Sequence, residues 1–406
     1  MAFKHSFAAL LLLLPAFSHG AKVPSLPPAR ASCSVLPEHL PLKNVSTLPD
    51  PFTFLNGEKV RNLDDFACRQ AEVNALFQRM ELGTLPPRPE KITSTFTNNN
   101  NLTINVSNEG KSISFNMPVQ FPTTGDGPFP VMIGVGGASI PIPSNVALIN
   151  FNNDDMAQQN SESSRGIGKF FDLYGVNATA SSMTAWAWAI SRIIDVLEDT
   201  PGHLNLDLDR IGVTGCSRDG KGALVAGAFD PRILLTIPQE SGSGGAGCWR
   251  ISDVMWNEGI DTQTAMEIVQ ENDWFSVGFE QYVNTTSLLP FDHHMLAGLV
   301  APRPLFVIDN TDYVWLGPES VWGCMSTAHK VYEALQIPDV MGVSQIGNHS
   351  HCDFPSDQQA QLSAFFDKFF FGDTKANTSV LETDGANGAN EFVESQWVDW
   401  AIPRLA

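Results

Sequence analysis

A glycine-flanked serine constrains the fold of this chain more than any other feature. A β-type run at residues 211–213 leads into the segment Gly-Cys-Ser-Arg-Asp-Gly (215–220), and small helix-forming residues follow at once. This order is typical of a nucleophile elbow, a sharp strand-to-helix turn that exposes a serine Oγ at the carboxyl edge of a parallel sheet. The match is imperfect because Asp219 stands where the usual G-x-S-x-G pattern has its second glycine. Ser217 is therefore a candidate nucleophile that needs support from the rest of the chain.

The order of predicted strands and helices supplies part of that support. Alternating apolar and polar residues between positions 91 and 118 predict antiparallel strands. Continuous apolar runs are typical of strands buried on both faces of a parallel sheet. Such runs follow at Pro130–Val135, Val146–Phe151, Ile211–Val213, Ile233–Ile237, Leu305–Ile308 and Met341–Ile346. Helical patterns occur between and after them, at Met183–Leu197, Gly222–Phe229, Met325–Leu335 and Gln358–Phe371. The sequence therefore predicts an α/β-hydrolase fold, a three-layer αβα sandwich around a mostly parallel sheet.

The N-terminus predicts export. Lys4 and His5 precede an apolar run at residues 7–17, and small residues lie on either side of position 20. This pattern predicts a signal peptide at residues 1–20. We expect the remainder, residues 21–406, to be a single α/β-hydrolase catalytic domain that is secreted to the extracellular space. No later apolar run is long enough for a transmembrane helix, so no membrane span is expected.

Cysteines and glycosylation motifs agree with export. Six cysteines, an even number, predict three disulfides in an exported chain, and the absence of a C-x-x-C pair argues against a zinc site. Seven N-x-Ser/Thr motifs mark candidate glycosylated surface positions, at Asn44, Asn101, Asn105, Asn177, Asn284, Asn348 and Asn377. The expected protein is a disulfide-bonded glycoprotein without a metal.

The charge balance limits the possible partners. The chain has 44 acidic and 24 basic residues and a formal net charge of −20. Nucleic-acid binding needs a basic surface, so nucleic acid is not an expected partner. Arg218 and Lys221 form a local basic pair beside the candidate nucleophile.

The histidine that would activate Ser217 should come late in the chain. A serine hydroxyl needs a histidine to take its proton, and hydrolase-fold enzymes carry these residues in the order serine, acid, histidine. His349 and His351 lie between the last predicted strand and the last predicted helix. Cys216 directly precedes the serine and Cys352 directly follows His351, and a disulfide between them would bring the two Cα atoms to about 5.5 Å. On that geometry we predict His351 as the base.

The acid partner is left open by spacing. Glu240 follows the predicted strand at 233–237, whereas Asp309 and Asp312 follow the strand at 305–308, the more usual place in hydrolase folds. The acid fixes the tautomer of the histidine and stabilises its charged form, so any of the three carboxylates suits the chemistry. Spacing alone slightly favours Asp309 or Asp312.

Several segments resemble the fungal glucuronoyl methylesterases, carbohydrate esterase family 15. The similarity is carried by residues 213–223, with the block G-C-S-R-D-G-K-G, by residues 237–242 and 248–250, and by Asp292-His293-His294, Trp315-Leu316-Gly317-Pro318 and His351-Cys352. It covers essentially the whole chain after the signal. The resemblance implies that Asp219 is the family's own variant of the elbow.

The same resemblance implies roles for individual residues. It implies Ser217 as nucleophile, His351 as base and Glu240 as the acid, with Asp309 and Asp312 in reserve. Arg218 would add a donor to the oxyanion hole. The residues implied to contact a glucuronate ring are Lys221, Gln263, Glu271 and Trp315. The implied disulfides pair Cys33 with Cys68, Cys216 with Cys352, and Cys248 with Cys324.

The function expected from the resemblance is hydrolysis of esters of 4-O-methyl-D-glucuronic acid. The expected partners are glucuronoxylan and lignin–carbohydrate esters, and we expect a monomer that needs no cofactor. Two alternatives differ in class. One is another plant cell-wall esterase, which would act on acetylated or feruloylated xylan, and the other is a catalytically silent hydrolase-fold protein that binds polysaccharide. The presence of serine, acid and histidine together favours an enzyme.

Overall fold

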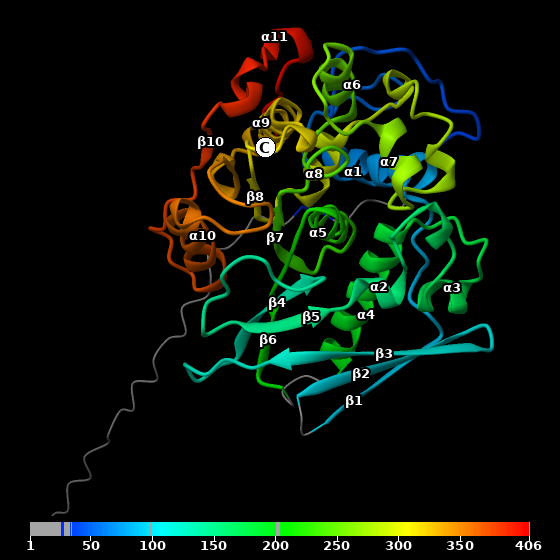
Figure 1. The fold of residues 1–406 in the computed structure, drawn as a ribbon, viewed down its shortest axis with the longest axis vertical. Coiled ribbons are helices and arrows are strands. Elements are labelled where there is room, and N and C mark those ends of the chain that lie inside the picture. The colour runs from blue at the N-terminus through cyan, green and yellow to red at the C-terminus, as the bar shows by residue number, and fades with distance from the viewer. Residues whose placement is uncertain (1–25, 28–32, 34, 98–99, 200–203, 406) are drawn as a thin grey trace, which may run out of the picture.

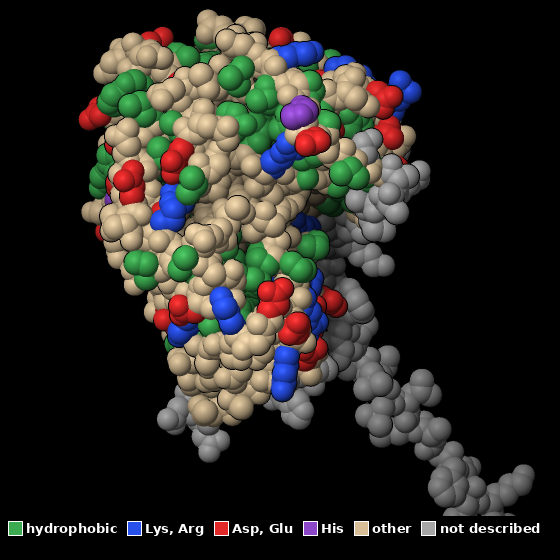
Figure 2. Space-filling model, turned by 90° about the vertical axis from the view of Figure 1, so that its right-hand side faces the viewer, with side chains coloured by type: hydrophobic (Ala, Val, Ile, Leu, Met, Phe, Trp, Pro, Cys, Tyr) green, Lys and Arg blue, Asp and Glu red, His purple; other side chains and the backbone are tan. Residues whose placement is uncertain are grey.

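The computed structural model describes residues 26–27, 33, 35–97, 100–199 and 204–405. The predicted signal peptide at residues 1–20 lies outside the described residues. No helix in the described ranges combines the length and apolar character needed to cross a membrane. On the face shown in Figure 2, lysine and arginine side chains stand among aspartate and glutamate rather than gathering in one area.

Among the described residues, ten strands form one sheet in the order β1-β2-β3-β5-β4-β6-β7-β8-β9-β10 (Figure 1). The first three strands pair antiparallel, and those from β5 to β10 pair parallel. Their bounds are β1 Lys91–Phe96, β2 Asn101–Asn108, β3 Lys111–Gln120, β4 Phe129–Val135, β5 Ala147–Phe151, β6 Leu206–Cys216, β7 Ile233–Gln239, β8 Leu305–Asp309, β9 Met341–Gln345 and β10 Leu381–Thr383. This is the predicted mostly parallel sheet with antiparallel strands at its start.

Helices cover both faces of the sheet. The α-helices are α1 Leu63–Phe77, α2 Asn153–Met156, α3 Lys169–Tyr174, α4 Ser182–Asp199, α5 Arg218–Phe229, α6 Trp249–Asn257, α7 Ala265–Glu271, α8 His293–Val300, α9 Pro318–Ala334, α10 Gln359–Phe365 and α11 Glu394–Trp397. Helices α4 and α5 pack together on one face, where Gly222 of α5 lies against Trp186 of α4. On the other face Phe365 of α10 stacks on Phe306 of β8 at 4.4 Å between ring centroids. Figure 1 shows α10 on the opposite side of the strands from α4 and α5.

The predicted helices differ from the observed ones mainly at their starts. Helix α9 begins at Pro318 rather than at 325, because a proline fits the first turn, where its missing N–H has no partner to lose. Helix α5 begins at Arg218, four residues before the predicted start; its first turn contains Gly220, a poor helix former, which hid this turn from the sequence pattern. The predicted helix at 358–371 is α10 followed by a π-helical turn, Phe366–Phe370.

The parallel strands deliver the candidate residues to one edge of the sheet. Ser217 directly follows β6, Glu240 directly follows β7, and Asp309 ends β8. The segment with His349 and His351 follows β9. Ligand sites of open parallel sheets lie outside the carboxyl ends of the strands, so the topology places these candidates where a site is expected.

Candidate active site

Ser217 occupies a strained turn between β6 and α5. Its φ of 59° and ψ of −126° lie in a region that side-chain-bearing residues rarely adopt. Its N–H donates to the carbonyl of Gln239 on the neighbouring strand at 2.9 Å. The turn is held in register with β7, which is the geometry of a nucleophile elbow.

The glycine requirement of the elbow falls on Gly215 and Gly220. A Cβ at Gly220 would lie 2.6 Å from the Gln239 carbonyl oxygen, and one at Gly215 would lie 2.5 Å from the Asp219 carbonyl oxygen. Asp219 itself turns away from this contact and accepts a hydrogen bond from Asn153 Nδ2 at 2.8 Å. The departure from G-x-S-x-G thus has a physical reason, because the close approach between α5 and β7 occurs one residue later.

Glu240 pairs with His351. Its side chain is fully buried, and its Oε2 accepts hydrogen bonds from His351 Nδ1 at 2.7 Å and from the Cys352 N–H at 3.0 Å. Gln239 Nε2 donates to the other carboxylate oxygen at 3.2 Å. When Nδ1 donates to this carboxylate in the neutral form of the ring, Nε2 is the nitrogen with the lone pair. This is the tautomer that a general base requires.

The two reserve carboxylates have other surroundings. Asp309 is fully buried, and burial raises its pKa to about 8, an effect that the neighbouring Glu240 charge strengthens. Asp312 accepts a hydrogen bond from the backbone N–H of Asn348 at 2.7 Å and so holds the start of the histidine loop. Among the described residues, neither aspartate bonds to the His351 ring, so the geometry favours Glu240 over the spacing-based preference for Asp309 or Asp312.

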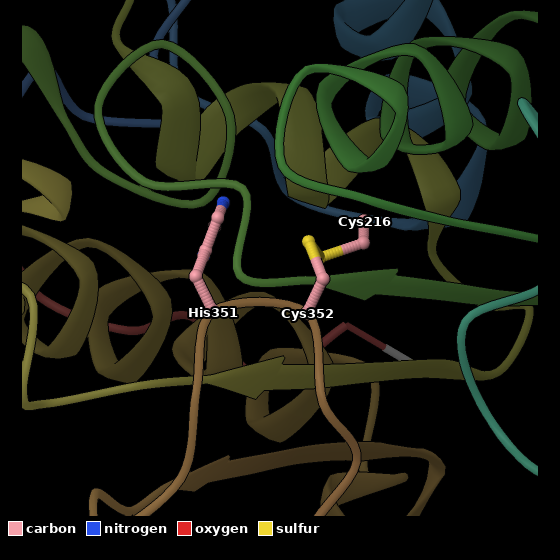
Figure 3. Close-up of side chains that lie close together, drawn as sticks. All are labelled: Cys216, His351 and Cys352. Atoms are coloured by element: carbon pink, nitrogen blue, oxygen red, sulfur yellow. A yellow bond between two sulfur atoms is a disulfide. The ribbon is translucent and has the colours of Figure 1, made fainter.

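A disulfide ties the serine to the histidine. Cys216 and Cys352 are bonded with their Cα atoms 5.8 Å apart, and Figure 3 shows His351 beside this bridge. Within the described ranges, no hydrogen bond joins Ser217 Oγ to His351, although both residues line the same pocket. Catalytic hydrogen bonds are often long in resting enzymes and shorten in the Michaelis complex. The other two disulfides are Cys33–Cys68 and Cys248–Cys324, which completes the expected pairing.

A pocket of about 600 Å³ opens at this edge of the sheet. Seven of the residues predicted to act in catalysis or sugar binding line it: Ser217, Arg218, Lys221, Gln263, Glu271, Trp315 and His351. Glu240 lies behind His351 and does not reach the pocket wall. The pocket therefore gathers residues from α5, the segments around α7 and the loops after β8 and β9.

Lys221 reaches the pocket from inside the protein. It is only 3% exposed, and its ammonium donates to the carbonyl oxygens of Ser241 and, at 2.8 Å, Ser243. Burial lowers its pKa to about 7, against the opposing effect of Asp309 and Glu271. An ammonium has three N–H donors. Two are used on the backbone, which leaves one for a ligand.

The remaining predicted contacts form one wall. Gln263 Nε2 donates to Glu271 Oε2 at 3.4 Å, and the backbone N–H of Gln263 donates to the Trp315 carbonyl at 3.1 Å. The Trp315 ring stands edge-on to the His351 ring, 4.8 Å between centroids. Thr264 caps the start of α7, so Gln263 lies just before the helix and Glu271 ends it.

Trp274 and Ser139 are among the pocket residues that sequence reasoning missed. Trp274 lines the pocket directly after α7, and Ser139 lines it from the glycine-rich turn after β4. Ser139 Oγ donates to Gln239 Oε1 at 2.5 Å, which links this turn to the neighbour of Glu240. The only sequence signal for Trp274 was its place three residues after Glu271.

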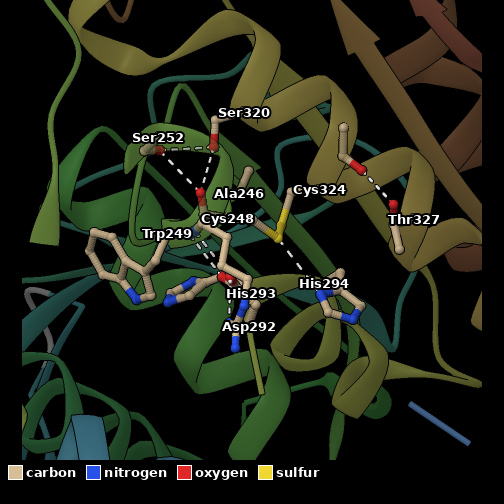
Figure 4. The surroundings of a disulfide bond; sticks show 12 residues. Ala246, Cys248, Trp249, Ser252, Asp292, His293, His294, Ser320, Cys324 and Thr327 are labelled. Atoms are coloured by element: carbon tan, nitrogen blue, oxygen red, sulfur yellow. Dashed lines mark hydrogen bonds and ion pairs between the residues drawn. A yellow bond between two sulfur atoms is a disulfide. The ribbon is translucent and has the colours of Figure 1, made fainter. Parts of the chain in front are cut away.

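Among the described residues, two groups of cysteine and histidine lie close enough together to suggest a metal site. They are Cys216, His351 and Cys352, and Cys248, His294 and Cys324. In each group the sulfurs are joined in a disulfide, as Figure 4 shows for Cys248 and Cys324. A cysteine binds a metal strongly only as a thiolate, so the disulfide-bonded cysteines of these two groups are not metal ligands.

The strained serine, the His351–Glu240 pair and their place beyond the parallel strands define an α/β-hydrolase. The model of the fungal glucuronyl esterases matches residues 104–336. A 4-O-methyl-glucuronoyl methylesterase of Hypocrea jecorina is 54% identical over 376 residues, covering 93% of this chain and 80% of the relative. This chain belongs to the fungal glucuronyl esterase family.

Solved structures agree with this assignment. The glucuronoyl esterase catalytic domain of Hypocrea jecorina, 54% identical, superposes with a TM-score of 0.87 over 91% of this chain and 100% of that one. A serine-to-alanine variant of a glucuronoyl esterase from Sporotrichum thermophile, in complex with methyl 4-O-methyl-β-D-glucopyranuronate, gives a TM-score of 0.88 at 46% identity. That comparison covers 92% of this chain and 100% of the other.

Proposed function

We propose that this protein hydrolyses esters of 4-O-methyl-D-glucuronic acid, with Ser217 as nucleophile, His351 as base and Glu240 as the acid that orients it. The observation that carries the proposal is the pocket, where the elbow serine and His351 share a wall with Lys221 and Trp315. The complex of the Sporotrichum thermophile relative with the methyl ester supports the substrate class.

The proposed reaction has two steps. Ser217 Oγ attacks the ester carbonyl carbon while His351 Nε2 takes its proton, and the same proton then passes to the departing alcohol. Water next attacks the acyl-enzyme with His351 as base, which releases the uronate and restores Ser217. Glu240, which bonds to Nδ1 at 2.7 Å, stabilises the imidazolium in both steps.

Each tetrahedral intermediate carries an oxyanion that needs donors. The Arg218 backbone N–H follows the nucleophile, the usual position of one oxyanion-hole donor in this fold. Its guanidinium lines the same pocket and would add a charged donor. Removing one such donor typically costs about 10²–10³-fold in kcat.

Lys221, Gln263, Glu271 and Trp315 are proposed to hold the uronate ring. Their polar groups can pair with sugar hydroxyls, and the indole offers an apolar surface to the ring. The buried ammonium of Lys221 has a donor available for this purpose.

Release of methanol from methyl 4-O-methyl-glucuronate tests the proposal. The wild-type protein should release methanol, and Ser217→Ala should lower kcat by about 10⁶-fold, as for other serine hydrolases that lose the nucleophile. A protein that left this ester intact while deacylating acetylated or feruloylated xylan would be a different cell-wall esterase. A silent polysaccharide-binding protein would bind glucuronoxylan without reacting at Ser217 with a fluorophosphonate probe.

We also propose lignin alcohols as natural leaving groups and secretion as a monomer. The His351 side chain, which would protonate the leaving alcohol, is 24% exposed, so a bulky alcohol need not be buried. Three disulfides favour an oxidising compartment. The ratio of kcat/KM for benzyl and methyl esters tests the leaving group. Recovery of a chain lacking residues 1–20 from the medium tests secretion. Size-exclusion chromatography with light scattering tests the monomer.

A further inference from the structure

The Trp274 ring lies near both cations of the pocket. The Arg218 guanidinium carbon is 5.4 Å from the centroid of the Trp274 ring, and Lys221 Nζ is 5.5 Å from it. The tryptophan is 4% exposed and lines the pocket. Both distances lie within the range of cation–π attraction, which strengthens where water is excluded.

The indole is itself fixed in place. Its Nε1–H donates to Gln159 Oε1 at 2.8 Å, and Gln159 Nε2 in turn donates to Asp154 Oδ1 at 2.7 Å. The Trp274 backbone N–H donates to Asn272 Oδ1 at 3.1 Å. The ring is therefore held from its edge and from its backbone, and its face can act as a platform.

The two cations depend on this platform to different degrees. Lys221 has two carbonyl acceptors that hold its ammonium without the ring. Arg218 differs, because among the described residues its guanidinium takes part in no side-chain hydrogen bond or salt bridge, and the Trp274 face is its one ring contact. The aromatic contact is thus the principal restraint on the orientation of the guanidinium.

An aromatic partner suits an oxyanion donor better than a carboxylate would. A carboxylate would occupy the N–H groups of the guanidinium and offset its charge. The ring face attracts the cation and leaves all five N–H donors free. A donor that is already oriented stabilises a developing oxyanion without reorganisation during the reaction.

We propose that Trp274 is a positioning residue that holds the Arg218 guanidinium ready for the oxyanion. The inference rests on the proposed function, because that function gives Arg218 its role. Trp274 acts through Arg218, so its loss should lower the rate of acylation more than it changes substrate binding.

A double-mutant cycle tests this coupling. Trp274→Leu and Trp274→Phe both lose the bond to Gln159, but only phenylalanine keeps an aromatic face. Trp274→Leu should lower kcat about 10–30-fold, the equivalent of about 1.4–2 kcal/mol. We expect Trp274→Phe to stay within about 3-fold of wild type and KM to change less than about 3-fold in either variant.

The background variant is Arg218→Gln. In that background Trp274→Leu should lower kcat by less than about 3-fold, because there is no guanidinium left to position. Trp256→Leu, at a tryptophan that is 50% exposed on α6, is the matched control and should behave as wild type. If Trp274→Leu does not fold, Trp274→Met, which fills more of the space, takes its place.

The rate of covalent labelling by a fluorophosphonate probe separates this proposal from the proposed function. A wild-type protein that labels but cleaves no glucuronate ester would overturn the function, and the cycle would then be measured on the labelling rate. The positioning role would be overturned if Trp274→Leu and Trp274→Phe lowered the rate equally. It would also be overturned if Trp274→Leu lowered the rate as much in the Arg218→Gln background as in the wild type. A protein that neither labels nor hydrolyses would overturn both.

Discussion

The Cys216–Cys352 bridge makes a prediction that separates stability from catalysis. The two cysteines are 136 residues apart in sequence, but the Cys248–Cys324 bridge is nested within them and spans 76 residues. The loop that the outer bridge closes in the unfolded chain is therefore only about 60 residues long. In the chain-entropy relation, a bridge that closes a loop of this length stabilises the folded protein by about 4 kcal/mol. The full separation of 136 residues would give about 5 kcal/mol.

The double variant Cys216→Ala/Cys352→Ala should lose about this much unfolding free energy. With an unfolding entropy of about 2 cal/mol/K per residue, the melting temperature should fall by roughly 5 °C. Differential scanning calorimetry and urea denaturation measure the two quantities. The bridge also ties the residue before Ser217 to the residue after His351, and a misplacement of about 1 Å between reacting groups can cost about 10²-fold. We therefore expect kcat to fall by about that factor at temperatures where the variant is fully folded.

The matched control is Cys33→Ala/Cys68→Ala. This bridge spans 35 residues and takes no part in the pocket lining. Its removal should also cost about 4 kcal/mol by the same relation, but leave kcat unchanged. Equal kcat losses in the two double variants would show that the lower kcat comes from the general loss of stability and not from the position of Ser217 and His351. An unchanged kcat in Cys216→Ala/Cys352→Ala would refute the tether argument.

Three further predictions concern buried titratable groups. Glu240→Gln should lower kcat for methanol release by about 10⁴-fold, because the amide cannot stabilise the His351 imidazolium; a loss below 10-fold would move the acid role elsewhere. Burial raises the pKa of Asp309 to about 8, so at pH 6 its carboxyl is neutral, and Asp309→Asn should keep kcat within about 3-fold there; a loss above 100-fold would show that its charge is needed. Burial lowers the pKa of His294 to about 4, below its value in the unfolded chain, so stability should be lost as pH falls from about 6.5 to 4, by about 3 kcal/mol. Urea denaturation across that range should show this loss in the wild type but not in His294→Gln, and parallel curves would contradict the buried neutral ring.

The sequence was informative wherever a local pattern determines structure. The parallel strands β4, β7, β8 and β9 are buried along almost their whole length, so their continuous apolar runs predicted them, whereas β10 is short and mostly exposed and gave no such run. The elbow was visible because a strained serine between a strand and a helix needs glycines close by in sequence. The acid could not be chosen in this way, because Glu240, Asp309 and Asp312 all follow neighbouring parallel strands and reach the same edge. The observation that favours Glu240 is its contact with two consecutive residues of the last loop, His351 and Cys352.

Contacts between distant segments were the part that sequence reasoning missed. Trp274 contacts a cation on α5 through a ring face, and such a contact has neither a period nor a spacing. The shift of the elbow glycine to Gly220 is similar, because only the distance to the Gln239 carbonyl shows why Asp219 is tolerated. In both cases the deciding partner lies on another element of the fold.

Gln239 connects the catalytic parts in a way that explains why they must be built together. Its carbonyl accepts the Ser217 N–H, its Oε1 accepts Ser139 Oγ–H, and its Nε2 donates to Glu240. One fully buried residue therefore links the elbow through its backbone, and the turn after β4 and Glu240 through its side chain. Because both side-chain polar atoms and the backbone carbonyl of Gln239 are hydrogen-bonded, a shift of one of these partners would leave a buried polar group unpaired, at a cost of about 1–3 kcal/mol. The strained elbow persists because its surroundings determine its position several times over.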